Sequence, residues 1–341
     1  MDFAPNILLA PHTTFALGGP ARLFCVVTNE DELVIAVTRA RRENLPLFLL
    51  GGGSNILVSD EGFPGLVIKN EIRGISFDEV AEDGTVHVTV GAGENWDAFV
   101  EQTVEEGLQG LETLSWIPGT VGAGPVQNIG AYGAEIADTV VSVTAFDVNT
   151  MSWVTLSKEE CRFAYRDSIF KQEKGRYIIA RVTFELRRGG VPNISYKDVT
   201  AYFTEKHVTQ PTLQEVRNAV IEIRTRKLPD WKVVGTAGSF FKNPIITEAA
   251  FQELLAKYPG LPRYSARPGS VKIPLGWVLE NMCHAKGLRI GHVSTYDKQA
   301  LVLVADKGAT AAEVMHMAQE LTKMVKEKTG IDIEREVEWV G

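Results

Sequence analysis

The sequence predicts an α+β fold divided into more than one domain, and three observations support this. The chain has 341 residues, which is more than one ordinary hydrophobic core accommodates. Short apolar segments bounded by Gly, Asp and Asn alternate with longer stretches whose apolar residues recur at helical spacing. Two glycine-rich segments, residues 51–55 and 117–133, interrupt this alternation. We therefore expect two or three domains that combine helices with short strands.

The first 55 residues predict a strand, a helix and a second strand. Residues 23–27 form an apolar strand, and Asn29 with Glu32 has the spacing of a capping box at the start of a helix. The apolar residues of this helix share one face: Leu33, Ala36, Val37 and Ala40. Residues 45–50 predict a buried strand that runs directly into Gly-Gly-Gly-Ser-Asn at 51–55. A glycine run after a buried strand is a candidate nest of backbone N–H groups for a phosphate.

The middle of the chain predicts a sheet with one helix. Strand-like segments before the second glycine-rich segment are residues 56–58, 65–69 and 86–91. A helix is expected to start at Asn95 and to end near Gly107. Strand-like segments after the second glycine-rich segment are residues 140–147, 153–156 and 177–186. Short strands joined by short turns predict a mixed or antiparallel sheet here.

The C-terminal third predicts further helices and strands. Helical spacing is found in residues 212–228, 249–258 and 274–282, and residues 300–304 predict a buried strand. Thr310 and Glu313 have the spacing of a capping box for a helix that ends at Gly330. Residues 331–339 alternate like a strand, which would place four carboxylates on one solvated face: Asp332, Glu334, Glu336 and Glu338.

Composition and charge exclude several classes of protein. The net charge of −8 and the pI near 5.4 disfavour nucleic acid or an anionic membrane as the main partner. Three widely spaced cysteines without a Cys-x-x-Cys pair exclude a zinc ribbon and a disulfide framework, so no metal site is predicted. The first fifteen residues contain no Lys or Arg, and no apolar run is long enough for a transmembrane helix. We expect a cytoplasmic protein.

Residues 117–133 carry the strongest functional signal. Five glycines and two prolines in seventeen positions prevent a long helix or a central strand, and the segment has almost no charge. Glycine lets a backbone approach a ligand closely, which suits a large flat cofactor with a diphosphate. The alternative is a tight structural loop, although such loops normally hold more charged residues. Neither the P-loop pattern nor the Rossmann pattern of glycines occurs in the chain.

A second signal is the basic segment 224–242. It contains five cations against the single anion Asp230, namely Arg224, Arg226, Lys227, Lys232 and Lys242. Such an excess in an acidic chain indicates a site for a phosphorylated ligand. A solvated helix end, where cations favour the helix dipole, is the alternative.

Four polar clusters complete the candidate residues, and each taken alone is more often structural than catalytic. They are Tyr-Arg-Asp-Ser-Ile-Phe-Lys at 165–171, Ser-Tyr-Lys-Asp at 195–198, Gly-Ser-Phe-Phe-Lys-Asn-Pro at 238–244 and Glu-Arg-Glu-Val at 334–337. Together with the two glycine-rich segments and Gln-Ala-Leu-Val-Leu at 299–303, they occur in the order found in one enzyme family. The chain closely resembles the UDP-N-acetylenolpyruvoylglucosamine reductase family from residue 14 to residue 341.

Some positions refine this resemblance. The segment around Tyr196 is similar to that of type I members, in which a loop with a tyrosine covers the substrate. Gly124 stands where the family usually has Ala, Trp231 replaces a usual Pro, and Thr236 replaces a frequent Asn. The last two changes bear on the geometry and affinity of the substrate loop, not on the reaction.

The resemblance implies a fold and a reaction. FAD would be held by two N-terminal subdomains of the vanillyl-alcohol-oxidase type, at residues 1–70 and 71–205. A C-terminal α+β substrate-binding domain would occupy residues 206–330, and the strand at 331–341 is a candidate for returning to the second subdomain. NADPH would reduce FAD, and hydride would then pass to the enolpyruvyl double bond of UDP-N-acetylglucosamine enolpyruvate. The product would be UDP-N-acetylmuramate, a precursor of the bacterial cell wall.

The resemblance also implies roles for individual residues. Arg166 would stabilise the negative charge that develops beside the substrate carboxylate, because a guanidinium is permanently charged and can bind a carboxylate with two hydrogen bonds. Ser239 would donate the proton and Glu336 would support it by hydrogen bonding. The substrate contacts would be Tyr196, Arg224, Lys227, Asn243 and Gln299. The cofactor contacts would be Gly51, Gly52, Gly53, Ser54, Asn55, Ile117, Pro118, Gly119, Gly122, Gln127, Asn128, Gly130, Ala131 and Tyr132.

Two other functions compete with this interpretation. One is another FAD oxidoreductase with the same cofactor fold, such as an oxidase of alcohols or sugars. The other is a catalytically silent protein that binds a nucleotide sugar. The retention of Arg166, Ser239 and Glu336 together argues against both. We expect the chain to act as a monomer on its UDP-sugar and NADPH, without a nucleic acid or membrane partner.

Overall fold

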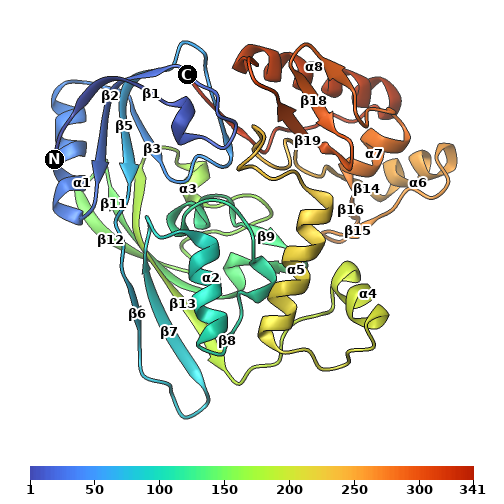
Figure 1. The fold of residues 1–341 in the computed structure, drawn as a ribbon, viewed down its shortest axis with the longest axis horizontal. Helices are drawn as coiled ribbons and strands as arrows, with labels where there is room; N and C mark the ends of the chain where they lie inside the picture. Colours follow the sequence, from blue (N-terminus) through green and yellow to red (C-terminus); the bar gives the residue numbers. More distant parts are fainter. The chain divides into compact units, whose positions relative to one another are not determined.

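The computed structural model describes residues 1–341 as two compact units, which are described separately (Figure 1). The first unit comprises Met1–Ile7, Ala21–Gly53 and Pro64–Arg226. The second comprises Leu8–Pro20, Ser54–Phe63 and Lys227–Gly341. Both units combine helices with strands, so the predicted α+β class is confirmed.

A four-stranded sheet with one helix forms one part of the first unit. The strand order is β1 (Ala4–Leu8), β2 (Pro20–Val27), β5 (Phe63–Asn70) and β3 (Leu47–Leu50), and β3 runs parallel to β5. Helix α1 (Glu30–Arg42) lies along this sheet (Figure 1) and packs its predicted apolar face against Cys25, Leu66 and Ile68. Asn29 caps α1 as expected, whereas the Glu32 carboxylate accepts from the N–H of Thr28.

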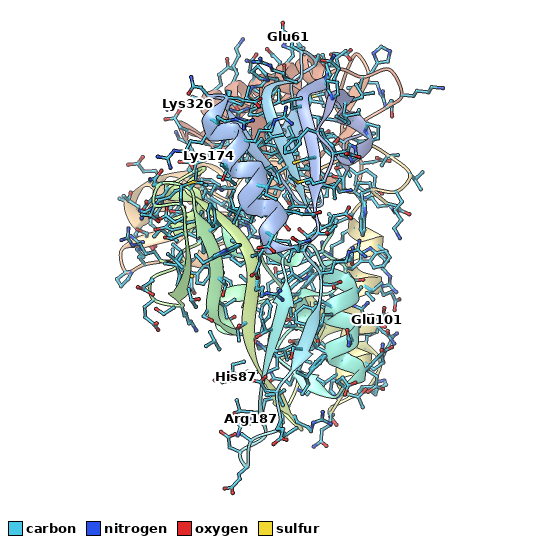
Figure 2. The ribbon with its side chains drawn as sticks, turned by 90° about the vertical axis from the view of Figure 1, so that its left-hand side faces the viewer. Glu61, His87, Glu101, Lys174, Arg187 and Lys326 are labelled. Atoms are coloured by element: carbon cyan, nitrogen blue, oxygen red, sulfur yellow. The ribbon has the colours of Figure 1, made fainter.

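An antiparallel sheet forms the other part of the first unit. Its order is β12 (Ser152–Ser157), β11 (Val140–Asp147), β13 (Tyr177–Arg188), β7 (Thr85–Gly91) and β6 (Ile75–Phe77), and the short β8 (Leu108–Gln109) also pairs with β13. Figure 2 shows His87 and Arg187 near one end of the paired strands β7 and β13. Helix α2 (Trp96–Glu105) packs on this sheet through Phe99, whose ring centroid lies 5.2 Å from that of Phe184.

Three smaller features complete the first unit. The strands β9 (Gly130–Ala131) and β10 (Ala134–Glu135) form a hairpin, and α3 (Ile169–Gln172) is a single turn. Helices α4 (Lys197–Glu205) and α5 (Leu213–Lys227) share a small core made of Val199, Phe203, Val216, Ala219, Val220 and Ile223. Helix α4 was not predicted from the sequence.

The second unit is built around three small sheets. The first has the order β14 (Ile245–Thr247), β16 (Ser270–Lys272), β15 (Tyr264–Ser265). The second has the order β17 (Arg289–Ile290), β18 (Val293–Tyr296), β19 (Gln299–Ala305). The third is the parallel pair β4 (Ile56–Val58) and β20 (Glu338–Val340). The helices are α6 (Glu248–Lys257), α7 (Leu275–Asn281) and α8 (Ala311–Thr329). Helix α8 starts at the predicted Thr310–Glu313 capping box and ends at Gly330, whose φ is +74°.

The structure corrects two expectations about the C-terminal region. Helix α5 belongs to the first unit, not to the expected domain 206–330, because it packs on α4. The last strand does not return to residues 71–205, since β20 pairs with β4 in the second unit. Residues 331–337 are not a strand, so the four carboxylates do not share one face. Ile333 and Val337 are buried, but Arg335, which a strand would place between them on the same face, is exposed, so burial does not follow the alternation of a strand.

None of the helices combines the length and the apolar character needed to cross a membrane. Cys25, Cys161 and Cys283 are all free and buried. Burial raises the pKa of Cys25 to about 11 and that of Cys161 to about 12, so neither thiol supplies a thiolate at neutral pH.

Candidate active site

The two glycine-rich segments predicted from the sequence touch each other in the first unit. A Cβ atom added to Gly52 would lie 2.6 Å from the Cα of Gly119, and one added to Gly51 would lie 2.7 Å from the Oγ1 of Thr120. Both distances are far below van der Waals contact. The neighbour of Gly52 is backbone, so only glycine fits there, whereas a Cβ at Gly51 would require the Thr120 side chain to move. The structure thus brings residues 51–53 and 117–133 together.

The second glycine-rich segment is held in place by the residues that lead into α2. The N–H of Trp96 donates to the carbonyl of Gly119 at 3.1 Å, and the N–H of Val121 donates to the carbonyl of Glu94 at 2.9 Å. A Cβ on Gly122 would lie 2.5 Å from the Cβ of Ala92. These contacts fix the path of the loop from both sides.

The side chain of Asn128 is engaged within the protein. It is 1% exposed, its φ is +47°, and its Nδ2 donates to Glu135 Oε2 at 2.7 Å and to the carbonyl of Ala164 at 3.1 Å. Its Oδ1 accepts from the N–H of Ala137 at 3.1 Å. Since both ends of the amide bind the protein, this side chain shapes the loop from inside. Apart from glycine, Asn and Asp are among the residues that best tolerate this left-handed backbone.

Arg166 is joined directly to the glycine-rich loop. Its Nη2 donates to the carbonyl of Gly130 at 2.8 Å, and a Cβ on Gly130 would lie 3.3 Å from its Nη1. The Nζ of Lys171 donates to the carbonyl of Arg166 at 3.2 Å, which fixes the backbone of the same turn. The missed residue Ser168 adds a bond from its Oγ to the carbonyl of Val126 at 2.6 Å.

Tyr132, Tyr196 and Arg224 meet in the first unit. The rings of Tyr132 and Tyr196 lie edge to face, with centroids 5.4 Å apart. Arg224 forms a hydrogen bond with Tyr132, and its Nε donates to the carbonyl of Trp116 at 3.0 Å. Burial raises the pKa of Tyr132 and lowers that of Arg224, although a guanidinium remains charged in proteins. One expected cofactor contact thus touches two expected substrate contacts.

In the second unit, Ser239 and Glu336 lie on neighbouring segments. Ser239 pairs with Val302 of β19 in an isolated bridge, and the N–H of the next residue, Phe240, donates to the carbonyl of Leu301 at 2.9 Å. The N–H of Glu336 donates to the carbonyl of Phe240 at 2.8 Å. The structure therefore brings two residues together that are far apart in the sequence.

The expected contacts Asn55, Asn243 and Gln299 lie in the same unit. Asn55 Nδ2 donates to the carbonyl of Glu336 at 3.2 Å. Asn243 Oδ1 accepts from the N–H of Leu275, the first residue of α7, at 2.9 Å. The side chain of Gln299 fills the space above Gly276, where an added Cβ would lie 2.6 Å from its Oε1. Asn243 and Gln299 thus both contact the first turn of α7.

The basic segment 224–242 is less positively charged than its sequence indicates. Arg226 forms an ion pair with Glu222, one turn earlier in α5. Lys242 Nζ lies 2.9 Å from Glu334 Oε2, and Lys232 Nζ lies 6.0 Å from the centre of the Trp231 ring. Carboxylates outside the segment therefore compensate two of the five cations, which a count within the segment misses.

Comparisons with known proteins agree along the whole chain. The model of a FAD binding domain matches residues 21–156, and that of the UDP-N-acetylenolpyruvoylglucosamine reductase C-terminal domain matches residues 229–340. The UDP-N-acetylenolpyruvoylglucosamine reductase of Neisseria gonorrhoeae is 45% identical over 97% of this chain and 96% of its own. That of Pseudomonas fluorescens is 41% identical over 98% of both. The solved UDP-N-acetylenolpyruvylglucosamine reductase from Thermus caldophilus is 26% identical, covers 100% of this chain and 98% of its own, and superimposes with a TM-score of 0.68.

Proposed function

The chain belongs to the UDP-N-acetylenolpyruvoylglucosamine reductase family, and from this premise we propose which residues carry the reaction. It is a flavoenzyme that uses FAD and NADPH to reduce the enolpyruvyl group of UDP-N-acetylglucosamine enolpyruvate. The product, UDP-N-acetylmuramate, is a precursor of peptidoglycan. When bound, FAD carries hydride from NADPH to the substrate.

The residues of the glycine-rich loops suit FAD. The backbones of Gly52 and Gly119 lie so close that a Cβ at Gly52 does not fit, and neither segment carries a charged side chain in its glycine-rich part. Such a surface allows close approach to a diphosphate and a flat ring system. We assign cofactor binding to the backbone of residues 51–55 and 117–132, with Asn128 shaping the loop rather than contacting FAD through its amide.

Arg166 is proposed to stabilise the negative charge that develops on the substrate. The bond from its Nη2 to Gly130 sets the orientation of the guanidinium relative to the cofactor loop. A positive charge held in advance stabilises a developing anion without reorganising during the reaction. This bond is the observation that most directly connects a catalytic side chain to the cofactor loop.

Ser239 is proposed to deliver the proton, and Glu336 to support it. A serine hydroxyl is a weak acid, so it needs a partner that stabilises or relays charge. The backbone bond between Glu336 and Phe240 keeps the two segments in register. We propose that the UDP-sugar is held by Tyr196, Arg224, Lys227, Asn243 and Gln299. Much of the chain after residue 205 would then serve substrate binding.

Turnover measurements test this proposal. The purified protein should show a flavin absorption spectrum and should oxidise NADPH much faster when the enolpyruvyl UDP-sugar is present. Oxygen consumption that depends on an alcohol or sugar and needs no NADPH would instead indicate an oxidase, and flavin that is never reoxidised by the UDP-sugar would indicate a silent binder. We further propose a cytoplasmic monomer, which sedimentation of the purified enzyme would check.

Lys227→Ala is expected to raise the KM for the UDP-sugar roughly 10- to 100-fold, the loss expected for one charge-assisted hydrogen bond to a phosphate. Reduction of the flavin by NADPH should be much less affected. Arg226→Ala is the matched control, because it removes the same charge from the adjacent residue, which is already paired with Glu222. An equal effect of Lys227→Ala on both half-reactions, or an equal KM in the two variants, would contradict the assignment.

A further inference from the structure

Trp116, which immediately precedes the cofactor loop, has an unusual backbone. Its φ is +60°, a left-handed conformation that costs a bulky residue energy and persists only where the surroundings enforce it. Residues 117 and 118 are Ile and Pro, and the proline restricts the residue before it to extended conformations. The backbone of Trp116 therefore sets the direction of residues 117–122 relative to the residues that precede Trp116.

Charged side chains hold both backbone polar groups of Trp116. Its N–H donates to Asp97 Oδ1 at 2.6 Å, and its carbonyl accepts from Arg224 Nε at 3.0 Å. Asp97 lies in the first turn of α2, whereas Arg224 lies in the last turn of α5. Side chains from two helices thus hold Trp116, one through its N–H and the other through its carbonyl.

Asp97 is itself fixed by a buried arginine. Arg217 of α5 is 3% exposed, and its Nη1 and Nη2 donate to the two carboxylate oxygens of Asp97 at 2.6 and 3.1 Å. Its Nη2 also lies 3.3 Å from Glu101 Oε1. Figure 2 shows Glu101 on α2. A fork of this kind fixes the plane of the carboxylate, and the burial of such a pair contributes little net stability.

We propose that Asp97 and Arg217 are positioning residues for FAD. Their ion pair holds Trp116 in its left-handed conformation and thereby sets the path of residues 117–122 along the cofactor. Trp96 supports the same path of the loop. Its Nε1 donates to the carbonyl of Leu114, before Trp116, at 2.9 Å, and its backbone N–H donates to the carbonyl of Gly119, after Trp116. This inference rests on the proposed binding of FAD by the glycine-rich loops.

Asp97→Asn tests the proposal, because it keeps the shape of the side chain and removes its charge. We expect the dissociation constant for FAD, measured by titrating the apoprotein and following flavin fluorescence, to rise roughly 10- to 100-fold. The visible spectrum of the bound flavin should shift, since the loop around the ring moves. Asp147→Asn is the matched control. Asp147 is 2% exposed, accepts two bonds from Arg176 and holds the turn between β11 and β12.

A second variant separates positioning from folding. In Asp97→Asn, the charge of Arg217 stays buried beside a neutral partner. The double variant Asp97→Asn/Arg217→Gln makes both partners neutral, so this protein is expected to stay folded and its FAD binding can be measured. Both proteins should bind FAD weakly while their circular dichroism stays that of the wild type. If either protein folds and binds FAD with wild-type affinity and spectrum, the proposal is overturned.

A rescue experiment addresses the mechanism itself. Glycine adopts a positive φ without strain, so the loop direction should depend less on Asp97 when residue 116 is glycine. The ratio of FAD dissociation constants between Asp97→Asn and its parent should therefore be smaller in the Trp116→Gly background than in the wild type. Equal ratios would show that Asp97 acts elsewhere. If Gly52→Ala also left FAD binding intact, the placement of FAD itself would be wrong, which is a distinguishable outcome.

Discussion

The Ser239→Ala enzyme is expected to bind FAD, accept hydride from NADPH and bind the UDP-sugar, but to lose roughly 10²–10⁴-fold in the rate at which the UDP-sugar reoxidises the reduced flavin. The reason is that removing the hydroxyl removes the proposed proton donor. The backbone bond from Phe240 to Leu301 and the bridge to Val302 hold this segment, and neither needs the side chain. Stopped-flow absorbance of the two half-reactions measures the effect.

Two further variants sharpen this test. Ser239→Cys keeps a proton donor and should recover part of the rate. Glu336→Gln keeps the shape and the backbone bonds to Phe240 and Asn55, but it removes the charge and should slow the same half-reaction. Ser294→Ala, a half-buried serine on the nearby strand β18, is the control and should leave both half-reactions unchanged.

A purely structural serine predicts a different result. If Ser239 only held a turn, its replacement by alanine would lower the free energy of unfolding by about 1 kcal/mol and leave turnover nearly intact. A Ser239→Ala enzyme whose flavin is reoxidised at the wild-type rate would remove this residue from the mechanism.

Gly52→Ala is expected to abolish stoichiometric FAD retention, with an affinity loss on the order of 10²-fold, as ångström-scale displacements in preorganised sites produce. The new Cβ would lie 2.6 Å from the Cα and 3.0 Å from the carbonyl carbon of Gly119. Both are backbone atoms, so no side chain can move aside and the two loops must separate. The flavin-to-protein absorbance ratio after gel filtration measures the result.

Gly175→Ala provides the matched control for Gly52→Ala. Gly175 has φ +81° and no heavy atom within 4 Å of an added Cβ, so alanine there introduces only backbone strain of about 1–2 kcal/mol. Thermal unfolding should show that both variants lose stability, whereas only Gly52→Ala should lose FAD. Full flavin content in a folded Gly52→Ala protein would mean that FAD does not bind where the two loops meet.

Features determined by short stretches of sequence were predictable. The start of α8 at Thr310, its end at Gly330 and the buried face of α1 follow from hydrogen bonds and side-chain periods that extend over only a few residues. The glycine-rich segments were equally visible, because glycine is required wherever the backbone comes close to another group. The order of these motifs was sufficient to identify the family, which the comparisons confirm.

Features that depend on distant partners were not predictable. Tertiary packing decided that β20 pairs with β4, since any strand edge of suitable length satisfies the same local pattern. It also decided the role of Asn128, whose bonds to Glu135, Ala137 and Ala164 depend on how the loop folds back.

The pair Asp97 and Arg217 shows this division most clearly. In the sequence, Asp97 is one of several acids early in a helix, and Arg217 is one of several cations in another helix. Only the packing of α2 near α5 brings their side chains within 2.6 Å and places both beside Trp116. Helical period and capping determined that each helix forms. The burial of one charge against another, 120 residues away in the chain, was decided by the tertiary structure, because an ion pair depends on distance in space and not on separation in sequence.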